Sequence, residues 1–137
     1  MDKKNPKKNT VMVIEDEILL LQAIVKKLEL NNFNIISCTS GKQAIDYLKS
    51  LSKTPDVIWL DYYLKDMNGL EFMREIKTNN LWSEIPVVVV SNSASEDKVK
   101  NMMAIGAKKY ILKAEHRLED IISTIKIIIN EEKVSKN

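Results

Sequence analysis

The amino-acid sequence predicts an α/β domain in which helices cover both faces of a five-stranded parallel sheet. Apolar runs rich in β-branched residues alternate five times with stretches whose apolar residues recur at helical spacing, and short links join them. The run PVVVV at 86–90 is apolar on both faces, which is typical of a central parallel strand. A chain of 137 residues has the length of one domain. We therefore expect a single doubly wound domain over residues 10–130.

The first half of the chain is expected to hold three strands and two helices. Apolar runs at 10–14, 33–38 and 56–60 predict the strands. Leucine, isoleucine and valine recur along one face between 17 and 30, which predicts an amphipathic helix. A shorter helix is predicted over 43–51.

The second half continues the alternation with three helices and two strands. Helical spacing over 69–77 predicts the third helix, and 86–90 is the fourth strand. Ser95 is a plausible N-cap for a helix that runs to about Ile105, where Gly106 ends it. A fifth strand at 109–112 and a last helix over 118–130 complete the pattern.

Composition narrows the class of protein. The net charge of +2 is too small to indicate a nucleic-acid partner, and no window is apolar enough to span a bilayer. The single cysteine, Cys38, excludes an internal disulfide and fits a reducing cytoplasm. Residues 1–9 carry four lysines and one aspartate, so a disordered basic tail is expected. Residues 131–137 are expected to form a short polar tail, with no further domain after them.

Chemically active side chains follow the predicted strands at the point where each strand ends. Glu15–Glu17 follow the first strand, Asp61 the third, Ser91 the fourth and Lys113 the fifth. The carboxyl ends of parallel strands meet at one edge of the sheet, where open α/β folds form their sites. We expect these side chains to share one shallow pocket.

The residue types in this pocket suit phosphoryl chemistry. Carboxylates held close together repel one another, and a hard cation with oxygen ligands such as Mg²⁺ relieves that repulsion. An ammonium and a hydroxyl would hold an oxyanion, and the central aspartate could be a covalent acceptor. His116 is the only histidine, Cys38 has no nearby base in the sequence, and no Walker loop is present.

Four motifs carry a resemblance to a known family. They are VIEDE at 13–17, WLDYYLKDMNGLEF at 59–72, VVVVSNSAS at 87–95 and GAKKYILKA at 106–114. The sequence resembles response-regulator receiver domains of two-component signalling, of the chemotaxis-regulator type, over residues 10–130. The resemblance implies a flavodoxin-like (βα)5 fold. The spacings from Asp61 to Ser91 and from Ser91 to Lys113 also agree with that family.

The resemblance implies a metal site and a phosphoacceptor. Asp61 matches the aspartate that takes the phosphoryl group. Asp16 matches the direct Mg²⁺ ligand, and Glu15 its acidic neighbour, which often acts through water. The backbone carbonyl of Tyr63 is expected to complete the set. A bulky Tyr63 side chain is also predicted to shield the acyl phosphate from water.

The resemblance also implies a switch. Ser91 matches the hydroxyl that bonds the phosphoryl oxygen, Lys113 the lysine that pairs with it, and Tyr110 the aromatic residue that turns inward. Three positions depart from the family, one of them Lys65, which replaces a common proline after the acceptor. Ala114 replaces the usual proline after the lysine, so a trans peptide bond is expected there, and Asn92 replaces a small residue after the switch serine.

Two apolar residues are candidates for partner contacts. At about 100° per residue, Leu19 and Ile127 fall opposite the inward stripes of their helices. In the family a histidine kinase or phosphotransfer protein docks beside the first helix, which makes Leu19 a docking candidate. The face of the fourth helix, fifth strand and fifth helix is the usual output or dimer surface, and Ile127 is the candidate there. Chance exposure explains either residue equally well.

Three functions remain open from the sequence. The first is a single-domain phosphoacceptor that catalyses its own modification and decay, has no separate substrate, and switches an output protein or a phosphorylation-linked homodimer. The second is a degenerate receiver that acts as a phosphorylation-independent interaction module. The third is a Mg²⁺-dependent phosphotransferase or phosphatase, although Tyr63 stands where such an enzyme needs a second acid.

Overall fold

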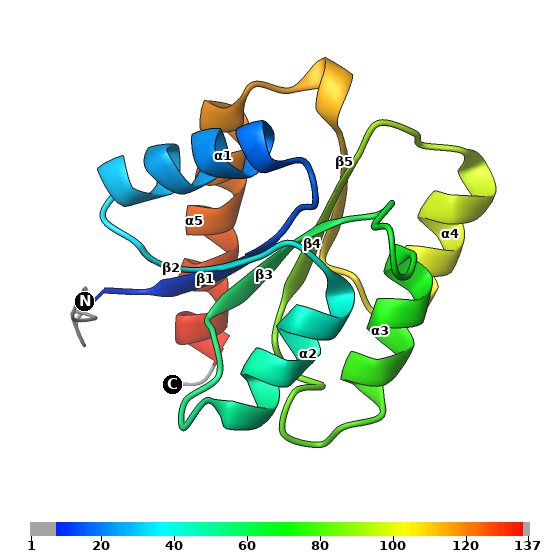
Figure 1. The fold of residues 1–137 in the computed structure, drawn as a ribbon, viewed down its shortest axis with the longest axis horizontal. Coiled ribbons are helices and arrows are strands. Elements are labelled where there is room, and N and C mark those ends of the chain that lie inside the picture. The colour runs from blue at the N-terminus through cyan, green and yellow to red at the C-terminus, as the bar shows by residue number, and fades with distance from the viewer. Residues whose placement is uncertain (1–7, 136–137) are drawn as a thin grey trace.

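A five-stranded parallel sheet forms the centre of the computed structural model, which describes residues 8–135 (Figure 1). The strand order is β2-β1-β3-β4-β5, and every pairing is parallel. The strands are β1 (Thr10–Ile14), β2 (Asn34–Cys38), β3 (Val57–Asp61), β4 (Val87–Ser91) and β5 (Lys109–Leu112). The predicted doubly wound architecture is confirmed.

Five α-helices cover the two faces of the sheet and create two separate cores (Figure 1). One face carries α1 (Ile18–Leu30) and α5 (Leu118–Ser135), and the other carries α2 (Gly41–Ser50), α3 (Gly69–Lys77) and α4 (Glu96–Ala104). Strands β1, β3 and β4 contribute side chains to both cores, which explains their continuous apolar runs. Among residues 8–135, no helix combines the length and the apolar character needed to cross a membrane.

The starts of α2, α3 and α4 are fixed by local side-chain hydrogen bonds. Ser40 and Ser95 cap α2 and α4 by accepting a backbone N–H three residues ahead. At α3, the Asn68 side chain accepts from the Glu71 N–H at 2.9 Å, and Glu71 Oε1 accepts from the Asn68 N–H at 3.3 Å. This capping box fixes the start of α3 only eight residues after Asp61.

The two ends of the chain differ from expectation. Helix α5 was predicted to end at Asn130, but it continues to Ser135 and takes in most of the segment expected to be a polar tail. Glutamate and lysine favour helices, no glycine or proline interrupts them, and Glu132 forms an ion pair with Lys108 at 3.2 Å. At the other end, Asn9 was expected in the disordered tail, yet its carbonyl accepts from the Asn34 N–H at 2.9 Å. Residues 1–7 of that tail lie outside the described residues, as do 136–137.

Gly106, predicted to end the helix before β5, has a backbone that other residues rarely adopt. Its φ is +109°, and a Cβ built there would lie 2.9 Å from Lys77 Cε. We expect Gly106→Ala to lower the free energy of unfolding by about 1–3 kcal/mol, measured by urea titration. Lys77→Ala combined with it removes the close contact, and Lys77→Ala alone measures the loss of the Lys77–Ser83 hydrogen bond, so that the backbone strain can be separated. Unchanged stability in Gly106→Ala would contradict this account.

Candidate functional site

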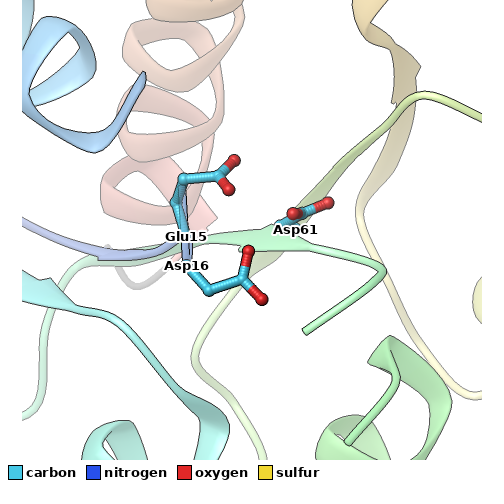
Figure 2. A group of neighbouring side chains, drawn as sticks. All are labelled: Glu15, Asp16 and Asp61. Atoms are coloured by element: carbon cyan, nitrogen blue, oxygen red, sulfur yellow. The ribbon is translucent and has the colours of Figure 1, made fainter. Parts of the chain in front are cut away.

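Three carboxylates converge at the carboxyl edge of the sheet. Oxygen atoms of Glu15, Asp16 and Asp61 all lie within 4.8 Å of one another. Figure 2 shows the three side chains turned toward a common space between the ends of β1 and β3. Glu15 and Asp61 are 1% and 7% exposed, and Asp16 is half-buried. The predicted acidic cluster is therefore present.

Strand pairing explains why these acids meet. Ile14 lies beside Leu60 in the parallel β1–β3 pair, so the next residues, Glu15 and Asp61, lie side by side at the carboxyl ends of the two strands. The Glu15 N–H is held by the Cys38 carbonyl at 3.0 Å, which extends the pairing of β1 with β2 by one step. Glu15 Oε2 also accepts from the Glu17 N–H at 3.1 Å as α1 begins.

Lys113 supplies the positive charge of the cluster. Its Nζ donates to Glu15 Oε1 at 3.0 Å and lies 3.6 Å from Asp61 Oδ1. The residue follows β5 directly and opens a short 3₁₀ turn, Lys113–Glu115. Every described peptide bond is trans, so the trans bond expected before Ala114 is confirmed.

The single ammonium of Lys113 does not balance the charge of the three carboxylates, and this imbalance favours the protonated form of Asp61. Burial of the carboxyl and repulsion from Glu15 raise the pKa of Asp61 from 3.8 to about 7, while Lys113 opposes the rise. A second cation beside Asp61 would favour its charged form. The cluster thus has the oxygen ligands and the excess of negative charge that are typical of a site for a hard divalent cation.

Ser91 and Tyr110 are joined through a single loop residue. Ser91 is fully buried at the end of β4, and its Oγ accepts from the Ser93 N–H at 3.2 Å. Tyr110 on β5 is half-buried, and its hydroxyl donates to the Ser93 carbonyl at 2.5 Å. The Tyr110 ring lies 6.4 Å from the Tyr62 ring. Both predicted switch residues therefore contact Ser93 directly.

Tyr63 lies on the loop that leaves the acidic cluster. Its backbone N–H donates to Asp61 Oδ1 at 3.4 Å, and the residue forms an isolated antiparallel bridge with Asn68. Its side chain is 47% exposed. Ligation of a cation by its carbonyl stays a prediction.

Lys98 is a residue that sequence reasoning missed. It lies in the first turn of α4, donates to the Tyr63 hydroxyl, and reaches Ser93 Oγ at 3.2 Å. Its ammonium is 4.6 Å from the centre of the Tyr63 ring and 5.7 Å from that of Tyr62. Lys98 thus connects the loop after Asp61 with the loop after Ser91. No sequence spacing marks it, since the contact joins residues 35 positions apart.

The two surface candidates are exposed, as the helical arithmetic predicts. Leu19 is 78% and Ile127 is 60% exposed. Ile127, however, lines a cavity together with Asn9 and Phe33, beside the start of β2. It therefore lies on the β2 side of α5. Its assignment to the surface formed by α4, β5 and α5 is wrong, because helical phase defines the outward side but not the neighbours on each flank.

Comparison with known proteins agrees with this geometry. The family model described as the response regulator receiver domain matches residues 11–126. The cell cycle response regulator CtrA of Brucella ovis is 32% identical over 124 residues, which cover 90% of this chain and 51% of CtrA. The chain thus spans about half the length of the curated relatives it matches.

Solved structures share the fold. A CheY-like receiver domain protein of Methanospirillum hungatei JF-1 superposes with a TM-score of 0.85 at 18% identity, covering 94% of this chain and 99% of that one. The phosphorylated cyanobacterial phytochrome response regulator RcpA gives 0.74 at 26% identity and covers 92% of each chain. From its sequence match and its fold, the chain belongs to the response regulator receiver domain family.

Proposed function

We propose that Asp61 accepts a phosphoryl group from the phosphohistidine of a sensor kinase or phosphotransfer protein. Receiver domains are phosphoacceptors of two-component signalling, modified on an aspartate in an acidic pocket that binds Mg²⁺. The observation that carries the assignment to Asp61 is its position between two acids and Lys113. No other described aspartate has both kinds of neighbour.

The transfer exchanges one bond to phosphorus for another. An Asp61 carboxylate oxygen attacks the phosphorus, the P–N bond to the donor histidine breaks, and the imidazole nitrogen keeps the electron pair and takes up a proton. Lys113, already 3.6 Å from Asp61 Oδ1, would pair with the incoming phosphoryl oxygens. Its present bond to Glu15 holds the ammonium in place before the donor arrives.

Mg²⁺ fits the residues that are present. Glu15, Asp16 and Asp61 offer only oxygen ligands, and the raised pKa of Asp61 reports an unmet need for positive charge. We propose that these acids and the Tyr63 carbonyl hold the ion. When bound, Mg²⁺ neutralises the charge that would otherwise repel a phosphoryl group.

Phosphorylation would be transmitted through Ser93. A shift of Ser91 toward a phosphoryl oxygen would move the Ser93 N–H that it now accepts from, and with it the partners Tyr110 and Lys98. These residues lead to the surface formed by α4, β5 and α5, which we propose contacts an output protein or a second copy of the chain. Leu19, exposed on α1 near the acidic cluster, is proposed to contact the phosphodonor.

A phosphorylation-independent interaction module is the alternative function. The complete set of acids with Lys113 favours the phosphoacceptor, whereas Ala114 and Asn92 are departures that keep the alternative open. We propose a cytoplasmic location because Cys38 is buried and unpaired, which suits a reducing compartment.

Incubation with acetyl phosphate and Mg²⁺ is expected to add one phosphoryl group, seen by intact mass spectrometry. Asp61→Asn should carry none, because it lacks the acceptor oxygen, while the exposed control Asp46→Asn should be modified like the wild type. An adduct that persists in Asp61→Asn would contradict the assignment. Absence of any adduct would favour the interaction module, and continuous turnover of acetyl phosphate without a lasting adduct would indicate a phosphatase.

The stability of the metal-free protein should fall as pH rises. The pKa of Asp61 is about 7 in the folded state, above its ordinary value of 3.8, so the folded protein binds the extra proton between these values. Its contribution is complete below about pH 4 and is lost through about pH 7. Thermal unfolding should show this slope in the wild type but not in Asp61→Asn, and Mg²⁺ should stabilise the wild type most at about pH 8. Equal slopes in both proteins would refute the assignment.

Tyr63→Ala is expected to shorten the lifetime of the phosphorylated protein by about threefold or more, because the ring no longer limits the approach of water to Asp61. Loss of the adduct is followed by mass spectrometry after the phosphodonor is removed. Tyr47→Ala is the matched control, since Tyr47 is a similarly exposed tyrosine on α2. An unchanged lifetime in Tyr63→Ala would show that the ring does not protect the phosphate.

A further inference from the structure

We propose that a second site, an apolar cavity on the α1–α5 face of the sheet, binds a compact ligand with one hydrogen-bond acceptor. The cavity has a volume of about 130 Å³. Leu20 and Ile24 of α1 line it on one side and Ile121 of α5 on another, and Trp59 and Val90 of the sheet also line it. The ligand of this cavity is not phosphate, and the cavity is distinct from the acidic cluster.

Trp59, one of the residues that line the cavity, carries an unpaired donor. The Trp59 indole Nε1–H is buried without a hydrogen-bond partner, the one such side-chain atom among the described residues. The side chain is 1% exposed, so solvent does not satisfy the group. Buried indole N–H groups usually find an acceptor, and an orphan in a native fold requires a reason. An acceptor brought by a ligand in the adjoining cavity is such a reason, after a small movement of the ring.

The lining offers one side chain that can accept a hydrogen bond, the imidazole of His116, and the Trp59 indole makes no hydrogen bond to it. The residues around the indole are aliphatic, and the two other polar lining residues are Lys113 and His116. The Lys113 ammonium is a donor and is already held by Glu15 and Asp61. The acceptor that fits is therefore a neutral oxygen or nitrogen on an apolar body.

Size and polarity select the class of ligand. An engineered apolar cavity of about 150 Å³ binds benzene and stays free of water. The cavity of this chain is about 130 Å³, is partly open to solvent and is lined mostly by aliphatic side chains, and this volume is enough for a six-membered ring. Ordered water needs two to four polar partners, and the lining offers three polar side chains, Trp59, Lys113 and His116, of which Lys113 is already held by Glu15 and Asp61. A small cyclic ketone matches both the volume and the single indole donor.

The cavity shares one residue with the acidic cluster. Lys113 lines the cavity and also contacts Glu15 and Asp61. A ligand that shifts the lysine stem would therefore alter the rate at which Asp61 is phosphorylated. This consequence rests on the proposed function, whereas binding itself does not.

The binding test uses cyclohexanone and methylenecyclohexane, which have the same shape but differ in the acceptor. The indole N–H resonances are observed in ¹⁵N-labelled protein and assigned with Trp59→Phe and Trp82→Phe. Cyclohexanone should shift the Trp59 resonance downfield and saturably. Methylenecyclohexane should bind at least tenfold more weakly and give no downfield shift.

Three variants separate the site from unspecific binding. Trp59→Phe keeps an aromatic ring without the donor; with binding followed by the backbone amide resonances of the lining residues, it should lose the preference for the ketone. Leu20→Phe should fill the cavity and abolish binding of both probes. Leu30→Phe makes the same change at the last residue of α1, where the side chain is 75% exposed, and should leave binding intact. Circular dichroism checks that each variant is folded, and Leu20→Met, which should weaken binding less, replaces Leu20→Phe if it is not.

Specific outcomes would overturn the proposal. One is a Trp59 resonance that does not saturate with cyclohexanone. Another is a bound water on the indole that the ketone fails to displace, and a third is a resonance that responds only to a phosphodonor protein. If cyclohexanone binds but Asp61 takes no phosphoryl group, the proposed ligand site is supported and the proposed phosphoacceptor function is refuted. If phosphorylation occurs at a rate that bound cyclohexanone does not change, only the coupling through Lys113 is refuted.

Discussion

Repulsion between carboxylates at the end of two buried strands is the constraint on which the site depends. Glu15 and Asp61 sit side by side because the β1–β3 register requires it, and burial prevents water from screening them. Lys113 relieves part of this repulsion, while burial of the carboxyl and the remaining repulsion from Glu15 keep the pKa of Asp61 raised. In the folded protein, the repulsion between these buried carboxylates can be relieved by a bound cation. Without one, it is relieved by protonation of Asp61.

The sheet separates two sets of contacts that both begin at this cluster. On the side of α3 and α4, the loops after Asp61 and Ser91 are joined by Lys98, Ser93 and Tyr110. On the side of α1 and α5, Lys113 lines an apolar cavity. Trp59 also lines this cavity, and its indole N–H has no hydrogen-bond partner. Polar bonds dominate the first set and aliphatic packing the second, so the two faces are suited to different occupants.

The family gives the common framework, and individual residues of this chain define the rest. Receiver domains share the sheet and the acidic pocket. Trp59 brings an indole donor into a core face that is otherwise aliphatic around it, and Tyr63 brings a large exposed ring to the loop after Asp61. Because the curated relatives are about twice as long as the matched region, their complete activities do not transfer to this chain directly.

The sequence by itself determined the order of elements, the parallel sheet and the acids with Lys113, because strand and helix periodicity are local and the carboxyl ends of parallel strands must meet. The end predicted for α5 was too early, because helix propensity continues past Asn130. The side of α5 on which Ile127 lies was also predicted wrongly, because helical phase does not identify the neighbouring elements. Only the tertiary structure revealed Lys98 against Tyr63 and the cavity beside Trp59. Those contacts join distant segments through side-chain length and rotamer, and no local pattern encodes either.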